Sequence, residues 1–171
     1  MCHKRGGNIS FFNVKKLNHV IEELKKDLGD GFIATDIWAT AEAQPIAGLN
    51  SQPKAVALFN EVTRMLDKTL KDSNYPGLGN YYLVDMGDKK LVVILQIGEY
   101  QQFILVNLRK TTMGILINVA LPNLLSRLAE AEDLAEPEMN NLAETDITTQ
   151  PRKQSAIQTF LDKFTRGMYS F

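Results

Sequence analysis

The chain has 171 residues, 44% of them hydrophobic, and a formal net charge of −1 from 19 basic and 20 acidic side chains. This balance disfavours a nucleic-acid-binding module, which carries a basic surplus, and no apolar run reaches the ~20 residues that a membrane helix needs. Cys2 is the single cysteine, and the polar N-terminal residues do not resemble a signal peptide, so we expect a cytoplasmic protein without an internal disulfide.

The first ten to twelve residues are expected to form an N-terminal arm, residues 1–12, ahead of a helix over residues 13–28. Asn13 is suited to cap the start of this helix and Gly29 to end it. Its apolar residues recur at helical spacing and form one face: Val14, Leu17, Val20, Ile21, Leu24 and Leu28.

Two strands are expected next. Residues 31–38 are rich in β-branched and aromatic side chains, and a short break at residues 39–42 separates them from a second segment at residues 44–49. The second segment contains Pro45, which has no N–H to donate to a neighbouring strand. We therefore expect it at an edge of the sheet.

A second helix is predicted from Pro53 to about Lys71, with Asn50 or Ser51 as its cap. Its apolar surface is wider than the ~100° that a helix needs to cover one face of a sheet. The surplus is buried either within the fold or against a second copy of the chain. The stripe comprises Ala55, Phe59, Val62, Leu66 and Thr69, and it is widened by Leu58, Met65 and Leu70.

Three further strands are predicted over residues 81–86, 90–96 and 102–108. The polar breaks between them are too short for a crossover helix, so neighbouring strands must be antiparallel. The middle strand is apolar at every position from Leu91 to Leu95. A strand with one wet face would alternate, so we expect helices on both faces of this sheet.

A third helix is predicted from Thr111 or Thr112 to about Ala131, with a kink or break at Pro122. Residues 132–154 have the polar, proline-containing composition of a linker. A C-terminal amphipathic helix is predicted over residues 155–171, and it packs either on its own domain or in a groove of a partner. Its apolar residues are Ile157, Phe160, Leu161, Phe164 and Met168.

The predicted fold class is α/β (α+β): a five-stranded, mainly antiparallel sheet covered by helices on both faces, in the order α-β-β-α-β-β-β-α, plus the C-terminal helix. This order combines with three local patterns, Gly31 to Ile37 (GFIATDI), Gln44 to Ala47 (QPIA) and Leu91 to Leu95 (LVVIL). Over residues 13–131 the chain thereby resembles the Roadblock family, which includes dynein light chains, Ragulator subunits and bacterial regulators of Ras-like GTPases. The family usually has a glycine at its first hairpin turn, where this chain has Ala41, Glu42 and Ala43.

The resemblance implies that the first and third helices share one face of the sheet and that the second helix covers the other. It also implies that two copies pair through the second helix and the strand after it. The residues expected in this dimer interface are Ala55, Phe59, Val62, Leu66, Tyr81 and Leu83. The family has no shared catalytic residues, so the resemblance implies none here.

Few residues suggest chemistry of their own. The chain has no phosphate-binding loop and no dinucleotide fingerprint. Its soft metal ligands are Cys2 and His3, in the predicted N-terminal arm, and His19, which has no ligand partner at i+4 on its helix, so they do not predict a zinc site of three or four ligands. Arg109, Lys110 and Thr111 place two cations at a helix start, where free N–H groups can hold an anion or contact a partner. A capped helix with two solvated cations is the more common explanation of that pattern.

These observations favour a non-enzymatic, dimeric interaction scaffold that binds or regulates a small Ras-like GTPase, with no metal and no cofactor. The alternative is a small-molecule-sensing α/β regulatory domain. That alternative requires a pocket of about 300 Å³ or more, and the apolar central strands supply few polar groups to orient a ligand.

Overall fold

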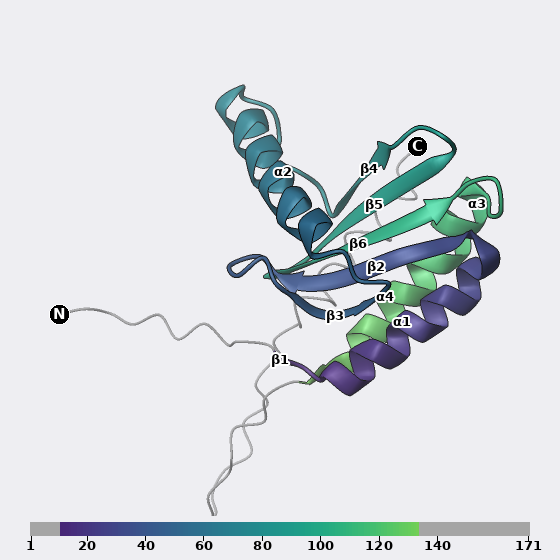
Figure 1. Ribbon diagram of the computed structural model, residues 1–171. Helices are drawn as coiled ribbons and strands as arrows, with labels where there is room; N and C mark the ends of the chain where they lie inside the picture. Colours follow the sequence, from purple (N-terminus) through teal and green to yellow (C-terminus); the bar gives the residue numbers. More distant parts are fainter. Residues whose placement is uncertain (1–10, 134–171) are drawn as a thin grey trace, which may run out of the picture.

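The computed structural model describes residues 11–133, which form a twisted sheet with helices on both faces (Figure 1). Residues 1–10 of the predicted arm, most of the predicted linker and the whole predicted C-terminal helix lie outside the described residues. The elements are β1 (Phe11–Phe12), α1 (Val14–Leu28), η1 (Gly29–Gly31), β2 (Phe32–Ala39), β3 (Pro45–Leu49), α2 (Pro53–Asp72), β4 (Tyr81–Asp85), β5 (Lys90–Ile97), β6 (Tyr100–Asn107), α3 (Met113–Ile115), η2 (Leu116–Ala120), α4 (Leu121–Ala131) and β7 (Glu132–Asp133).

The main sheet has five strands in the order β3-β2-β6-β5-β4, and every neighbouring pair is antiparallel. This confirms the predicted fold class, including the position of β3, with Pro45, at an edge. The other edge is β4. In β5, all residues from Leu91 to Leu95 are buried, as expected for a strand with both faces covered.

The two faces of the sheet carry cores of unequal size. On one face, α1, η2 and α4 pack against the odd-numbered residues of β5, such as Val93 and Leu95. On the other face, α2 contributes the buried Val56 and Phe59 and the partly buried Ala55 to a smaller core. The helices are thus divided between the faces as the sequence resemblance implies (Figure 1). The smaller core also contains Ala34, Trp38, Val92, Ile94 and Phe103.

Both predicted ends of α1 are confirmed. The Asn13 side chain accepts hydrogen bonds from the backbone N–H groups of Lys15 and Lys16, at 3.0 and 3.4 Å. At the other end Gly29 has a φ of 55°, which favours glycine, and its N–H donates to the carbonyl of Lys25. Local sequence chemistry therefore fixes where α1 begins and ends.

The third helix is interrupted before Pro122, as predicted. Residues from Leu116 to Ala120 form a π-helical segment, and the N–H of Leu121 donates to the carbonyl of Leu116. A regular α-helix begins at Leu121, with Pro122 in its first turn. Proline has no N–H to bond back along the helix, and the wider π turn accommodates this gap within a continuous helical path.

The fold extends beyond both ends predicted for the domain. Phe11 and Phe12 of β1 pair with Asp133 and Glu132 of β7 in a two-stranded antiparallel ladder. The Phe12 ring also packs edge-on against Tyr100 at the end of β6, with 4.9 Å between ring centroids. Strands of two residues leave no periodic pattern in a sequence, so this ladder was not predicted.

The start of α2 differs from the prediction. The residue that precedes the helix is Gln52, not Asn50 or Ser51, and its side chain makes no capping hydrogen bond. The Gln52 N–H instead donates to Oδ2 of Asp36 at 2.7 Å. Asp36 is fully buried in β2, so a distant strand supplies the acceptor that a local cap residue was expected to supply.

Gly48 of β3 pairs with Asp36 across the two strands and leaves room for its carboxylate. A Cβ at Gly48 would lie 2.0 Å from Asp36 Oδ1 and 2.9 Å from the carbonyl of Thr35. We expect Gly48→Ala to lower the free energy of unfolding by about 1–3 kcal/mol, the usual cost of overpacking, as measured by denaturant titration. The matched control is Gly79→Ala, where a Cβ meets nothing within 4 Å. An equal effect of the two substitutions would contradict this account.

Candidate interaction surface

Helix α2 contacts the sheet through its N-terminal half only. Its buried residues are Val56, Phe59 and Thr63, and none of the nine residues from Arg64 to Asp72 is buried. The ribbon shows this C-terminal half leaving the sheet at an angle (Figure 1). The surface of α2 beyond Thr63 is therefore open to contacts outside the described fold.

Four polar contacts hold the buried half of α2. Besides the bond from Gln52 to Asp36, the Trp38 indole N–H donates to Oδ1 of Asn60 at 3.0 Å, and Asn60 Nδ2 donates to the carbonyl of Thr40 at 3.2 Å. One turn further along, Thr63 Oγ1 lies 2.8 Å from the Tyr82 hydroxyl of β4. These bonds attach α2 to β2, to the turn after β2 and to β4.

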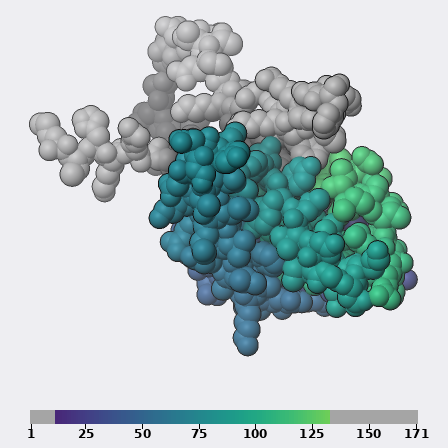
Figure 2. Space-filling view, turned by 90° about the horizontal axis from the view of Figure 1, so that it is seen from above, coloured from purple at the N-terminus to yellow at the C-terminus, as the bar shows by residue number. Residues whose placement is uncertain are grey.

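The outward side of α2 carries large apolar side chains that the fold does not cover. Leu58, Met65 and Leu66 are 56%, 60% and 37% exposed. Figure 2 shows α2 beside the strands from β4 to β6 on the face seen from above. A helix whose apolar side chains remain exposed over more than two turns, next to a sheet edge, is typical of an interaction surface.

Strand β4 presents different residues to the two faces of the sheet. Tyr82 and Val84 pack against the α2-side core, and Tyr81 and Leu83 lie on the opposite face, beside Leu95 and Val93 of β5. Tyr81 and Leu83 are 36% and 39% exposed. Because β4 is an edge strand, both sets border the same edge of the molecule.

The structure does not bring the six residues predicted for the dimer interface onto one face. Phe59 is buried in the core under α2, and Ala55 and Val62 are half-buried. Leu66 is exposed on α2. Tyr81 and Leu83 lie on the opposite face of the sheet from these four. The predicted residues are therefore divided between the two faces beside β4.

The predicted anion or partner site at Arg109, Lys110 and Thr111 is not assembled as one cluster. Arg109 forms an exposed ion pair with Asp88, at 2.5 Å. Thr111 is buried, and its side chain fills the space that a Cβ on Gly31 would need. The helix start itself is capped by Thr112, which accepts from the N–H of Ile115. Lys110 remains exposed beside them.

A polar hollow of ≈ 340 Å³ lies between α2 and the strand ends. It was not predicted, because its members are far apart in the sequence. Gln101 is buried there with no hydrogen-bond partner for its Oε1 atom. Asp67 has a pKa below its usual value, because Lys71 donates to its carboxylate and so does the N–H of Leu78. The lining residues are Thr40, Ala41, Asn60, Thr63, Arg64, Asp67, Gln96 and Gln101.

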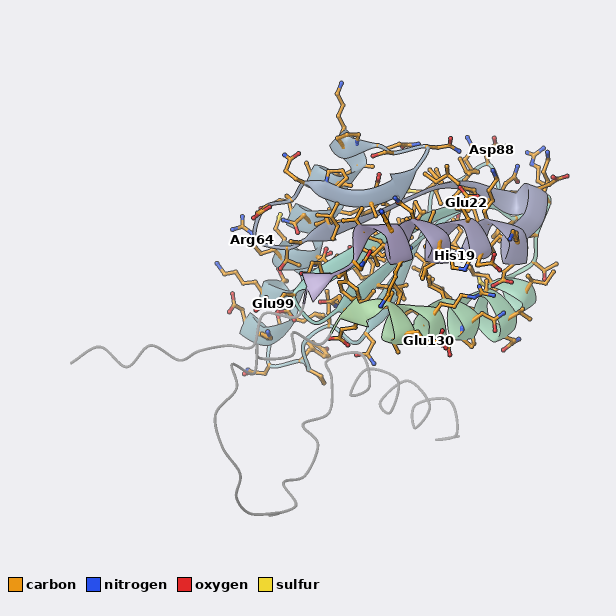
Figure 3. The ribbon with its side chains drawn as sticks, turned by 90° about the horizontal axis from the view of Figure 1, so that it is seen from below. His19, Glu22, Arg64, Asp88, Glu99 and Glu130 are labelled. Carbon is orange, nitrogen blue, oxygen red and sulfur yellow. The ribbon has the colours of Figure 1, made fainter. Side chains whose placement is uncertain are left out.

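A larger open hollow of ≈ 560 Å³ lies at the seam between α1 and α4. His19 on α1 and Glu130 on α4 border it, and Figure 3 shows these two helices side by side. Arg127 crosses the seam and donates to Asp27 of α1 at 2.6 Å. Glu23 has a lowered pKa, chiefly because Lys26 donates to it. The basic and acidic side chains around this hollow, such as Arg127 and Glu23, therefore largely neutralise one another.

Within residues 11–133, no three His, Cys, Asp or Glu side chains lie close enough together to hold a metal ion. No helix in the same range is both long and apolar enough to cross a membrane.

The bond between Tyr82 and Thr63 gives a test of how α2 is held. We expect Tyr82→Phe to cost about 0.5–1.5 kcal/mol at neutral pH, the usual contribution of one hydrogen bond. Burial raises the pKa of Tyr82 above 10.0, although the bond to Thr63 lowers it in part. Above pH 10 the unfolded chain therefore loses this proton before the folded chain does, and the Tyr82 contribution to stability falls as the pH rises.

The stability difference between wild type and Tyr82→Phe should accordingly narrow above pH 10, as measured by urea titrations at several pH values. Tyr75→Phe is the matched control, because Tyr75 is 67% exposed. A difference that widens at high pH would contradict this description of α2.

Comparison with known proteins gives matches to solved structures alone. No family model and no curated protein matches the chain. Myxococcus xanthus MglB matches with a TM-score of 0.58 and 14% identity, over 76% of this chain and 91% of that chain. A structure described as MglB with tetrameric arrangement matches with a TM-score of 0.55 and 12% identity, over 69% and 89%. A Roadblock/LC7 domain from Streptomyces avermitilis matches with a TM-score of 0.50 and 10% identity, over 66% and 95%.

Proposed function

We propose that this chain, whose Roadblock fold the structural matches confirm, is a homodimeric scaffold that binds a small Ras-like GTPase and contributes surface rather than catalytic groups. The observation that carries the proposal is the exposed apolar side of α2 beside the uncovered edge strand β4. The GTPase partner rests on the sequence resemblance, since the family it points to includes bacterial regulators of Ras-like GTPases.

Two features at one edge of the molecule support self-association. Leu58, Met65 and Leu66 expose apolar area on α2, and β4 has a neighbouring strand on one side only in the described sheet. An edge strand of this kind is a template for pairing with another chain. A structural neighbour, MglB, is described in a tetrameric arrangement, so a related fold also self-associates.

A twofold arrangement satisfies both features at once. Two β4 strands that pair antiparallel would join the sheets of two copies, and a twofold axis presents the same patch from each copy. The two α2 helices would then lie next to each other on one face of the joined sheet. Their exposed apolar side chains would be buried in the interface.

The arginines of the described residues support a non-catalytic role toward a GTPase. Arg64 is paired with Glu61, Arg109 with Asp88 and Arg127 with Asp27. An arginine that stabilises phosphoryl transfer must be available to the nucleotide. We expect any stimulation of hydrolysis to act by ordering the GTPase's own residues, and preference for one nucleotide state requires different affinities for the two.

The dimer is tested by substitutions on the outer side of α2. We expect light scattering to give twice the 19.2 kDa chain mass for wild type. Leu66→Glu should weaken the dimer at least tenfold, about 1.4 kcal/mol, because it places a charge in an apolar interface. Lys68→Glu, at an exposed position on a different side of the helix, is the matched control. A wild-type monomer at tens of micromolar would exclude this assembly.

The partner is tested by titrating the dimer against the host's small GTPases, each loaded with GDP or with a GTP analogue. We expect one GTPase to bind with at least tenfold preference for one nucleotide state. Leu66→Glu should lower that affinity, and Lys68→Glu should not. Failure of every GTPase to bind the intact dimer would refute the partner while leaving the dimer in place.

The alternative function, sensing of a small molecule, has one observation in its favour. The polar hollow beside α2 exceeds the about 300 Å³ expected of a ligand site. Most of its polar groups already bond to the protein, as Asn60 and Asp67 do. Native mass spectrometry of the protein purified from its host separates the two functions, because a sensor would retain a bound small molecule.

A further inference from the structure

The exposed half of α2 is tied to the loop that follows it. This half, from Arg64 to Asp72, lies away from the sheet, and the chain then returns to β4 through residues 73–80 (Figure 1). Within residues 11–133, Asp67 is the one side chain of this half that forms a hydrogen bond or ion pair outside α2 itself. Its Oδ1 atom accepts the N–H of Leu78 at 3.0 Å. One carboxylate therefore links the exposed half of α2 to the loop.

The residues that follow Leu78 are bonded to β5. The carbonyl of Gly79 accepts from Nε2 of Gln96 at 2.8 Å, and the carbonyl of Asn80 accepts from the N–H of Gln96 at 2.8 Å. Tyr81, the next residue, begins the edge strand β4. Residues 78–80 therefore form a strap that is bonded to α2 at one end and to β5 at the other.

The loop backbone lies directly against the helix at Asp67 and Lys71. A Cβ on Gly77 would lie 2.8 Å from Asp67 Oδ1 and 2.9 Å from Lys71 Cε. Lys71 also donates to the Asp67 carboxylate, but its side chain is 63% exposed, and exposed ion pairs contribute little to stability. A hydrogen bond to a carboxylate is stronger than one between neutral groups. The bond from Leu78 to Asp67 is therefore the main polar attachment.

The exposed half of α2 needs such an attachment to keep its shape. Its nine residues span about 14 Å of helix, and none of them is buried. A helical segment of this length is marginally stable in water on its own. Met65 and Leu66 precede Asp67 directly, and their exposed side chains belong to the proposed dimer surface. Without the strap, dimerisation would have to order these residues, and that ordering weakens binding.

We propose that Asp67 is a positioning residue for the dimer. Through the strap it holds the exposed half of α2 and the start of β4 in a fixed relation, so that both parts of the dimer surface are in place before two copies meet. Asp67 acts through Leu78 and the loop rather than by contact with the second copy. This inference rests on the proposed dimer and adds to it the residue that organises its surface.

Hydrogen exchange of the Leu78 N–H tests the strap separately from the dimer. The full-length chain carries Leu66→Glu and is kept at a concentration at which light scattering shows a monomer. Asp67→Ala should accelerate exchange of this amide at least tenfold, because the substitution removes its acceptor. Asp72→Ala, which removes an exposed carboxylate from the same helix, should leave the rate unchanged. An unchanged rate in Asp67→Ala would overturn the proposal, whether or not the chain dimerises.

The effect on the dimer is measured in the otherwise wild-type chain by sedimentation over a dilution series. Asp67→Ala should weaken the dimer at least tenfold, although alanine favours the helix itself. Asp67→Asn keeps an acceptor for the Leu78 N–H and should restore most of the affinity. Asp72→Ala should keep the wild-type affinity. Rescue by asparagine would show that the hydrogen bond, rather than the charge, is what the dimer requires.

The results separate this inference from the proposed function. Faster exchange of the Leu78 N–H together with an unchanged dimer affinity would overturn the positioning role and leave the dimer in place. Equal weakening by Asp67→Ala and Asp72→Ala would also overturn it, because the effect would then follow the charge of the helix. Failure of the dimer itself appears in the wild-type chain, before any substitution at Asp67.

Discussion

The buried carboxylate of Asp36 determines how the second helix meets the sheet. It accepts the N–H of Gln52 directly before α2, where the helix dipole favours a negative charge. A buried carboxylate needs hydrogen bonds. Oδ2 of Asp36 has one from Gln52, which also positions the helix start, whereas Oδ1 is buried without a hydrogen-bond partner. Gly48 permits the arrangement, because a side chain at this position would collide with the carboxylate. The buried Asp36 of β2, the start of α2 and the glycine at position 48 therefore depend on one another.

Helix α2 is attached to the sheet at its N-terminal end only, and this explains why its C-terminal half is exposed. The bonds of Asn60 and Thr63 extend the attachment as far as β4, and beyond Thr63 no residue of α2 is buried. The first and third helices, in contrast, cover their face with a large continuous core. The exposed half of α2 and the edge of β4 consequently lie together, and that juxtaposition is the basis of the proposed dimer.

Elements with strong local patterns were predictable from the sequence. Asn13 and Gly29 delimit α1, the apolar run from Leu91 to Leu95 indicates a doubly covered strand, and Pro122 marks the break in the third helix. Contacts between distant residues were not predictable. Nothing near Gln52 in the sequence reveals that Asp36, in a distant strand, accepts the hydrogen bond at the start of α2. The placement of Leu83 across the sheet from Leu66 depends on the register of β4, which the alternating pattern alone leaves open in an edge strand.

The central claim is that β4 joins the sheets of two copies. Half of the N–H groups of an edge strand point away from its only neighbour and exchange readily with solvent unless another strand covers them. Hydrogen exchange of residues 81–85 across a range of protein concentrations measures this most directly. The account predicts that these outward N–H groups become protected as the chain concentration rises, in step with the appearance of the dimer. Rapid exchange of the same groups in a sample that is fully dimeric would contradict it.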